Sequence, residues 1–132
     1  MRIVPNFRIS DAAALLGVSD DTVRRWIDQG TLETTGAVPA EISGTVLAAH
    51  ALALAKQAGD PTGVLSSARN RFVGLVTRVQ RDGVMAQVDI QCGPHRVVSL
   101  MSSEAVDDLG LEVGSLAVAS VKATTVTVEV PR

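Results

Sequence analysis

The sequence is poor in aromatic residues, in cysteine and in net positive charge. Aromatic residues make up 2% of its 132 residues, with two Phe, one Trp and no Tyr. Cysteine occurs once, as Cys92, which excludes an internal disulfide framework and a cysteine-rich zinc module. Twelve basic and 14 acidic residues give a formal net charge of −2, which excludes a uniformly basic nucleic-acid coat protein.

Long apolar runs are also absent. The longest lies near 46–55, is interrupted by His50, and has about half of the ~20 residues that a membrane span needs. Residues 1–5 carry neither the apolar region nor the small-residue cleavage site of a secretion signal. We therefore expect a soluble, cytoplasmic protein with no membrane partner.

Residues suited to catalysis or metal binding are few. The sequence shows no Ser-His-Asp set, carboxylate pair or phosphate-loop glycine motif. Cys92-Gly-Pro-His95 offers two zinc ligand types, but a structural zinc needs four ligands, and the other histidine is His50 in a different region. We interpret this tetrapeptide as a hairpin tip, and we predict no catalytic residue, no metal site and no enzyme.

What the sequence does contain is a 46% hydrophobic content, mostly small aliphatic residues, and a change of pattern near its middle. Residues 9–58 follow helical periods, whereas residues 72–130 mostly alternate with period 2. Between them lies a cluster of breakers, Ala58-Gly-Asp-Pro-Thr-Gly63. The fold class is therefore expected to be α+β, with a helical domain at 1–60, a linker at 61–66 and a β domain at 67–132.

The helical domain is expected to hold three helices. Ser10 is expected to cap a short helix that ends at Gly17, and Ser19 a second helix that ends at Gly30. The short junction between them makes a helix-turn-helix plausible. A third helix over 43–58 is apolar nearly all round, so we expect it to be buried, in part against another subunit or the second domain.

The second helix presents two arginines on its polar face. With Val23, Trp26 and Ile27 facing inward, Arg24 and Arg25 face outward, where they suit phosphates or guanine edges.

Two carboxylates leave a second interpretation open. Asp21 precedes Arg25 by four residues and Asp28 follows it by three, so intrahelical pairs can occupy that guanidinium. From the chemistry alone, this face is equally compatible with an ordinary solvated helix.

Residues 7–32 hold a characteristic series: an Ala pair before Leu-Gly-Val-Ser, then Thr-Val-Arg-Arg-Trp, then Gly-Thr-Leu. This series resembles the helix-turn-helix of the MerR and excisionase type. The resemblance implies that the helix at 20–29 enters the major groove, with DNA contacts at Ser19, Thr22, Arg24 and Arg25. That family usually continues into a basic wing, whereas residues 31–44 contain no Lys or Arg. We therefore expect modest affinity per copy and binding by two or more copies.

The second domain alternates as a small antiparallel sheet does. Val84, Ala86, Val88, Ile90 and Cys92 are expected to share one face of a strand. The preceding strand is expected to present Val73, Leu75, Thr77 and Val79 on one face, with Asp82-Gly83 as the hairpin turn between the two. Further strands are expected around 97–101, 116–122 and 126–130, with a short helix from Ser103 to Gly110. Five strands and one helix fit a small OB-like barrel.

The same region carries Ser67-Ala-Arg-Asn70, Gly74, Val106-Asp-Asp-Leu-Gly-Leu111, Gly114 and Val121-Lys-Ala-Thr-Thr-Val126. In these residues it resembles the Mop or TOBE domain of molybdate-binding proteins, the molbindin-like fold. The resemblance implies an oxyanion site between subunits, with 67–70 of one chain facing 122–124 of another. It also implies a homo-oligomer, for which both a dimer and a hexamer remain open.

The chemistry of these two segments suits a tetrahedral oxyanion of charge −2. Arg69 and Lys122 supply positive charge, and Ser67 and Thr124 supply hydroxyl donors. Backbone N–H groups complete the expected nest, from Ala68, Asn70 and Ala123. The family commonly adds a Thr-x-x-Ser before the short helix, and the matching positions are Ser102 and Ala105, so one hydroxyl is missing. On spacing alone, surface cations and a linker serine are the favoured interpretation, and the resemblance favours the oxyanion site.

Together the two resemblances imply a DNA-binding transcriptional regulator that responds to molybdate or tungstate bound at subunit interfaces. The alternative is a molybdate or tungstate storage or buffering protein whose helical domain serves assembly. A third possibility is a regulator whose β domain only oligomerises. Molybdate and tungstate share one shape and nearly one size, so both remain open as the ligand.

Overall fold

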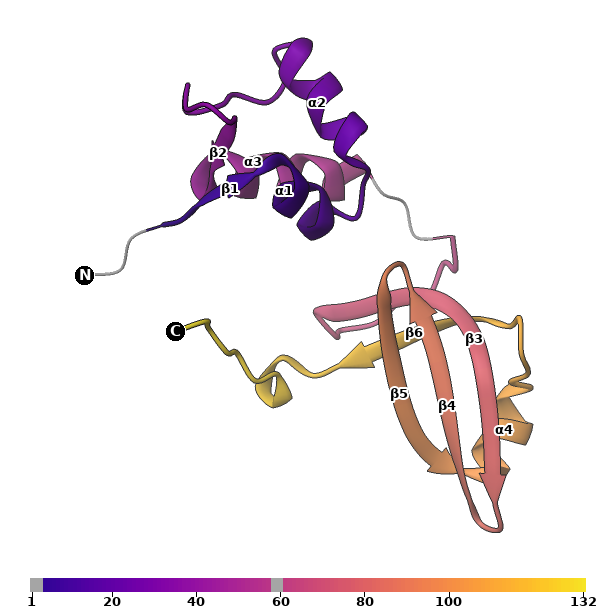
Figure 1. Ribbon diagram of the computed structural model, residues 1–132. Helices are drawn as coiled ribbons and strands as arrows, with labels where there is room; N and C mark the ends of the chain where they lie inside the picture. Colours follow the sequence, from indigo (N-terminus) through magenta and orange to yellow (C-terminus); the bar gives the residue numbers. More distant parts are fainter. Residues whose placement is uncertain (1–3, 58–60) are drawn as a thin grey trace. The chain divides into compact units, whose positions relative to one another are not determined.

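The chain divides into two compact units, Met1–Gly59 and Asp60–Arg132. A computed structural model describes residues 4–57 and 61–132 and shows a helical first unit and a second unit built on a curved sheet (Figure 1). Among the described residues, no helix is both long and apolar enough to cross a membrane.

The first unit combines helices with a small sheet. β1 (Asn6–Arg8) pairs antiparallel with β2 (Glu41–Ser43), and three helices follow the chain: α1 (Ile9–Leu16), α2 (Asp20–Asp28) and α3 (Gly44–Gln57). The two-stranded sheet is an addition to the elements expected from the sequence. It joins the start of the unit to the segment that leads into α3 (Figure 1).

The core of this unit is small and aliphatic. Its fully or nearly fully buried residues are Ala12, Ala13, Val23, Leu32, Ile42 and Leu47. Trp26 and Ile27 pack against them, so the inward face predicted for the second helix is confirmed. Within the unit, Leu52 of the third helix is 60% exposed, so the expected cover of part of this helix by another subunit or the second domain stays a prediction. α3 buries Leu47 against the core and leaves other apolar residues at the surface of the unit.

The helix ends follow the expected chemistry at Ser19 and Gly17 but not at Ser10, and α2 ends at Asp28, two residues before the expected Gly30. Ser19 caps α2, since its Oγ accepts a hydrogen bond from the Thr22 N–H at 3.1 Å. Gly17 ends α1 in the left-handed conformation, with a φ of 69°. The cap predicted at Ser10 is wrong, because α1 already begins at Ile9 and its N-cap is Arg8. The last residue of β1 therefore leads directly into the helix.

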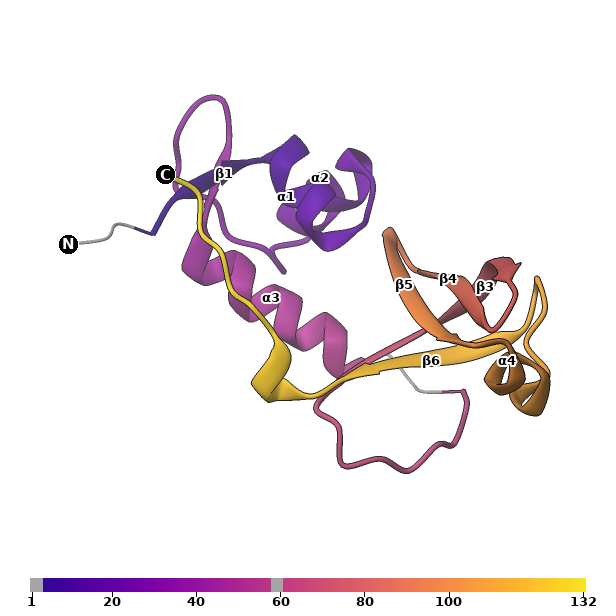
Figure 2. The same cartoon turned by 90° about the horizontal axis from the view of Figure 1, so that it is seen from below.

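The second unit is a four-stranded antiparallel sheet with one short helix. The strand order is β5-β4-β3-β6, for β3 (Asn70–Asp82), β4 (Met85–Cys92), β5 (His95–Ser102) and β6 (Leu116–Val121). Helix α4 (Ser103–Leu109) follows β5 and ends at Gly110, and Figures 1 and 2 show it beside the curled sheet. The mixed α+β class and the curled antiparallel sheet agree with the expected fold.

The fifth strand predicted at 126–130 is not formed. A 3-10 turn at Ala123–Thr125 follows β6, and the chain beyond it pairs with no strand among the residues that the structure describes. The alternation of valine with threonine and glutamate favours a strand, but a strand also needs a hydrogen-bonding neighbour. Val126, Val128 and Val130 are exposed, and Val128 reaches 83%.

A β-bulge corrects the predicted face of β3. The register with β4 shifts between Val76 and Arg78, so that Val76 is buried whereas Leu75 is 53% exposed. The predicted set of Val73, Leu75, Thr77 and Val79 therefore does not share one face. In β4 the prediction is confirmed from Ala86 to Cys92, whose alternate residues are buried, whereas Val84 lies outside the strand in the turn.

Candidate functional site

A hollow of about 520 Å³ lies where β3 begins and β6 ends. These strands are antiparallel, with Asn70 opposite Val121, so the segment before β3 and the segment after β6 adjoin. The lining residues are Ser66, Ser67, Ala68, Arg69, Ser120, Lys122, Ala123 and Thr124. Two motifs more than 50 residues apart thus meet at one end of the sheet.

Local hydrogen bonds fix the backbone around this hollow. The Asn70 side-chain amide donates to the Val121 carbonyl at 3.2 Å and ties the two strand ends together. The Ala68 N–H donates to the Ser66 Oγ at 3.1 Å. The Lys122 carbonyl accepts from both the N–H and the hydroxyl of Thr125, at 3.0 and 2.8 Å. The main chain on both sides of the hollow is therefore held by side chains of the same segments.

The positive charges of the hollow are unpaired within the described part of the chain. Neither Arg69 nor Lys122 forms an ion pair there, in contrast to Arg81, which contacts the Asp107 carboxylate at 2.7 Å. Two cations beside the hydroxyls of Ser67 and Thr124 provide charge and directed donors for a dianion.

The structure brings together six of the eight residues predicted for the oxyanion site and leaves two outside the hollow. Asn70 adjoins it, but its amide is bonded to Val121. Ser102 lies at the end of β5, where its Oγ accepts from the Ala105 N–H at 3.0 Å and caps α4. The expected backbone donor at Ala68 is also already used by Ser66.

The two motifs already adjoin within one chain, where residues of 67–70 and 122–124 line one hollow. The pairing of 67–70 of one chain with 122–124 of another, which the resemblance implies, stays a prediction. The motifs adjoin because of the register of β3 with β6, which places Asn70 beside Val121. The same register explains two residues that the sequence reasoning missed, Ser66 and Ser120, because no local motif distinguishes them from other serines.

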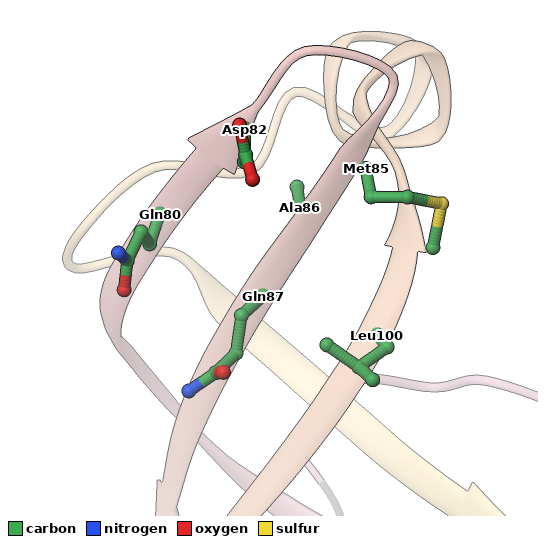
Figure 3. A pocket seen from close by; sticks show the side chains of 6 residues that line it. All are labelled: Gln80, Asp82, Met85, Ala86, Gln87 and Leu100. Atoms are coloured by element: carbon green, nitrogen blue, oxygen red, sulfur yellow. The ribbon is translucent and has the colours of Figure 1, made fainter.

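A second hollow, of about 240 Å³, lies on the sheet near the β3–β4 turn (Figure 3). Its lining residues are Gln80, Asp82, Met85, Ala86, Gln87 and Leu100. It offers a carboxylate and, among these lining residues, no cation. This hollow therefore does not suit an anion, in contrast to the one at the other end of β3.

The predicted DNA-contacting residues lie together on or just before α2. Arg24 pairs with Asp21 at 3.2 Å, so the ion pair that was expected to occupy Arg25 forms at its neighbour instead. Arg25 is exposed and has no ion pair in the described residues. The hydroxyls of Ser19 and Thr22 are 2.9 Å apart and bonded to each other. α2 thus presents one paired and one free guanidinium.

The surroundings of the single cysteine, Cys92, fit a side chain that packs in the core rather than a reactive thiol. Cys92 is buried, its Sγ lies 3.6 Å from the Phe72 carbonyl, and burial raises the pKa of its thiol. In residues 4–57 and 61–132, no three His, Cys, Asp or Glu side chains gather closely enough to hold a metal ion.

Comparisons with known proteins divide the chain in the same way as its structure. The helix-turn-helix domain family matches residues 7–39, and the TOBE domain family matches residues 66–128. A probable molybdenum-pterin-binding protein of Haemophilus influenzae is 45% identical over 65 residues, which are 48% of this chain and 94% of that protein.

Solved structures give similar local matches. MopII from Clostridium pasteurianum is 31% identical with a TM-score of 0.48, over 50% of this chain and all of that one. A molybdate-binding protein from Sporomusa ovata is 29% identical with the same TM-score, over 50% of this chain and 98% of its own. The cytoplasmic molybdate-binding protein ModG, with molybdate bound, is 35% identical with a TM-score of 0.44, over 48% of this chain and 46% of its own. Because it is 45% identical to the Haemophilus protein over 94% of that protein's length, and the TOBE domain family matches the same region, the chain belongs to the TOBE-domain proteins. A helix-turn-helix domain precedes its TOBE domain.

Proposed function

We propose that the chain is a DNA-binding transcriptional regulator that responds to a tetrahedral oxyanion, molybdate or tungstate. One observation carries this proposal. Two unpaired cations and two hydroxyls converge on one hollow of the TOBE domain, in a chain that also has a helix-turn-helix domain.

The ligand assignment follows from charge and donors. Two cations balance an anion of charge −2, and charge-assisted hydrogen bonds from Arg69 and Lys122 are the strongest that the hollow can supply. The 3-10 turn uses the N–H groups of Thr125 and Val126, so the preceding N–H groups, at Ala123 and Thr124, complete the donor set. The names of the relatives, for molybdenum-pterin or molybdate, support an oxyanion of this class.

The DNA-binding part is α2 with its cap. In a helix-turn-helix the second helix lies in the major groove, which places the residues at Ser19, Thr22, Arg24 and Arg25 at the DNA. Arg25 is the strongest candidate for a base contact, because its guanidinium is free of the carboxylates beside it.

Self-association completes the proposal. Beside the oxyanion hollow lies an apolar hollow of about 610 Å³ that shares Ser66 and Ser120 with it. The C-terminal segment at 126–132 has further exposed valines, at Val126, Val128 and Val130. Such surface is unusual in a monomer and typical of an interface between copies, so we propose a homo-oligomer, a dimer or a hexamer, in the cytoplasm.

The test measures DNA binding of the full chain with no oxyanion, with molybdate, with tungstate and with sulfate. The duplex is the tightest binder selected from a random pool. We expect molybdate and tungstate to change the affinity by about fivefold or more, a usual size for coupled sites. Sulfate, a smaller dianion, tests whether the hollow selects by size as well as by charge. Lys122→Ala should bind DNA normally without ligand and lose the response. Identical affinity in all four conditions contradicts regulation, because a ligand without differential affinity shifts no equilibrium.

A storage or buffering role is the second candidate, and the charge of the first unit favours it. Residues 31–44 contain no Lys or Arg, and Asp21 engages Arg24. In this case native mass spectrometry should show several molybdate ions per oligomer while no duplex binds at moderate salt. Tight, sequence-selective DNA binding would rule out this alternative.

A further inference from the structure

A small hollow of about 320 Å³ lies in the first unit where β1 leads into α1, and two arginines line it. Arg8 comes from the end of β1 and Arg24 from the middle of α2. Asp20 and Pro39 lie on its other sides. The hollow thus joins the strand before the first helix to the second helix of the helix-turn-helix.

Arg8 holds an unpaired charge on a fixed piece of backbone. Its neighbours in β1 are paired with β2, with Phe7 opposite the buried Ile42 and Arg8 opposite Glu41. Although Glu41 faces it across the sheet, Arg8 forms no ion pair within the part of the chain that the structure describes. It is also the N-cap of α1, which has no side-chain acceptor at that end. The guanidinium is therefore exposed and available to an external anion.

Arg24, across the hollow, is held only loosely. Its pair with Asp21 is a surface contact of 3.2 Å in which the side chains are 55% and 94% exposed. Exposed pairs of this kind contribute little and exchange readily for a stronger acceptor. The Asp20 carboxylate opposes an anion in the same hollow, so the site is adapted to one anionic group rather than to a strongly charged ligand.

The distribution of cations in the first unit also favours a phosphate contact at the hollow lined by Arg8 and Arg24. The segment after α2, at 31–44, contains no cation, so this chain lacks basic residues where a wing would touch DNA. Phosphate contacts supply most of the sequence-independent affinity of DNA-binding proteins. If α2 occupies the major groove, these contacts have to come from other cations of the same unit, and Arg8 is the unpaired one that lines a hollow with α2.

We propose that Arg8, assisted by Arg24, binds a phosphodiester group of the DNA backbone and anchors the helix-turn-helix. This proposal rests on the proposed DNA binding and adds a binding site outside the base-reading residues. Asp20 limits the strength of the anchor, so its charge sets how tightly the phosphate is held.

The experiment compares the wild-type full chain with Arg8→Ala, Asp20→Asn and Arg25→Ala on two duplexes, the tightest binder from a random pool and a scrambled version, over a salt series. Arg8→Ala should weaken binding to both duplexes by the same factor, on the order of tenfold at low salt, and lower the slope of log affinity against log salt by about 1. Asp20→Asn should strengthen binding to both. Arg25→Ala should weaken the selected duplex far more than the scrambled one. Thermal unfolding of each variant checks that the first unit stays folded.

The outcomes separate this inference from the function on which it rests. If wild type binds neither duplex, both the regulator and the anchor are refuted. If wild type binds and Arg8→Ala matches it in affinity and salt slope, the anchor alone is refuted. A loss confined to the selected duplex also overturns it, because a phosphate contact carries no sequence information.

Discussion

The two units of this chain place their cations in opposite ways. In the second unit, Arg69 and Lys122 stand unpaired around one hollow with serine and threonine hydroxyls. In the first unit, Arg8 and Arg24 share a hollow with the Asp20 carboxylate, and Arg24 is paired with Asp21. Two unpaired cations without a carboxylate suit a small dianion, whereas cations interspersed with carboxylates suit the single charges of a nucleic-acid backbone. The net charge of −2 conceals both arrangements.

The largest expected effect tests the role of the two unpaired cations, Arg69 and Lys122, at the hollow of the second unit. Lys122→Ala removes one of the two charges at the hollow, and hydrogen bonds to charged groups contribute about 1.5–3 kcal/mol, so molybdate affinity should fall roughly 10- to 100-fold. Isothermal titration calorimetry of the full chain measures it. The matched control is Arg78→Ala, a cation of the same unit that bonds Gln80 at 2.8 Å and does not line the hollow. Equal losses in the two variants would mean that general charge, and not these two cations, holds the anion.

The next effect concerns the backbone of the second unit. A Cβ at Gly74 would collide with the backbone carbonyl of Gln91 and lie 2.7 Å from the Cys92 Sγ. Since neither β3 nor β4 can yield without breaking their ladder, Gly74→Ala should cost about 3 kcal/mol, at the upper end for overpacking. Urea unfolding of the second unit measures the loss.

The first unit provides the comparison. At Gly44 a Cβ would meet the Val4 Cγ1 at 2.6 Å and the Pro5 carbonyl at 2.9 Å. The Pro5 carbonyl is backbone and has to shift by a few tenths of an ångström, whereas alanine favours the helix that begins there by up to about 1 kcal/mol and offsets part of this cost. Gly44→Ala should therefore cost less stability than Gly74→Ala, where the closest atom is a strand carbonyl in the sheet. Similar losses would contradict the difference in rigidity between the two sites.

The fold was predictable where local chemistry decides it. Ser19 and Gly17 bound their helices as expected, and β4 alternates as its residues do. The predictions fail where the structure of a segment depends on pairing with another segment of the chain. The three residues of β1 are too few to show a period, and the bulge after Val76 depends on the pairing with β4. The segment at 126–130 has the composition of a strand but no partner in one chain.

The site was predictable to the same extent. Residue types and the resemblance identified the two segments that contain Arg69 and Lys122. The register of β3 with β6 determined that they meet within one chain, and that Ser66 and Ser120 join them. No single-sequence pattern contains that register. Arg8 was missed for the same reason, since its role depends on a hollow formed with α2.

A smaller effect should follow acidification of the second unit. Asp89 is 5% exposed, and hydrogen bonds from Gln87 and Arg96 lower the pKa of its carboxyl below the usual value. A lowered folded-state pKa stabilises the fold above the unfolded pKa of about 3.9, and this contribution disappears as the pH falls through the folded value.

Asp89→Asn should therefore be less stable than wild type near neutral pH, by less than the loss in Gly74→Ala because Arg96 is half-exposed. Below pH ~4 wild type itself loses this contribution, so the difference in stability between the two proteins should shrink. Urea unfolding between neutral and acidic pH measures both. The control is Asp108→Asn, an exposed carboxylate on α4. If Asp89→Asn and wild type show parallel pH dependence, the Asp89 interactions do not stabilise the fold.

The smallest expected effects come from two matched serine caps, one in each unit. Ser19 and Ser102 accept N–H bonds of 3.1 and 3.0 Å at the starts of α2 and α4. Replacing either by Ala should cost about 1 kcal/mol of stability in its own unit. The stability loss alone does not show whether Ser102 also serves the oxyanion, because a hydroxyl can accept the cap bond and still donate to an anion.

Ser102→Asp separates the two roles. Aspartate caps a helix as well as serine, so the second unit should keep its stability, while the added negative charge would repel an oxyanion near it. Because Ser102 lies outside the hollow in one chain, it can act there only from a second copy. If copies associate in this way, Ser102→Asp should weaken molybdate binding and Ser102→Thr, which keeps cap and hydroxyl, should not. Unchanged molybdate affinity in Ser102→Asp would mean that Ser102 only caps α4 and that residues of a single chain bind the oxyanion.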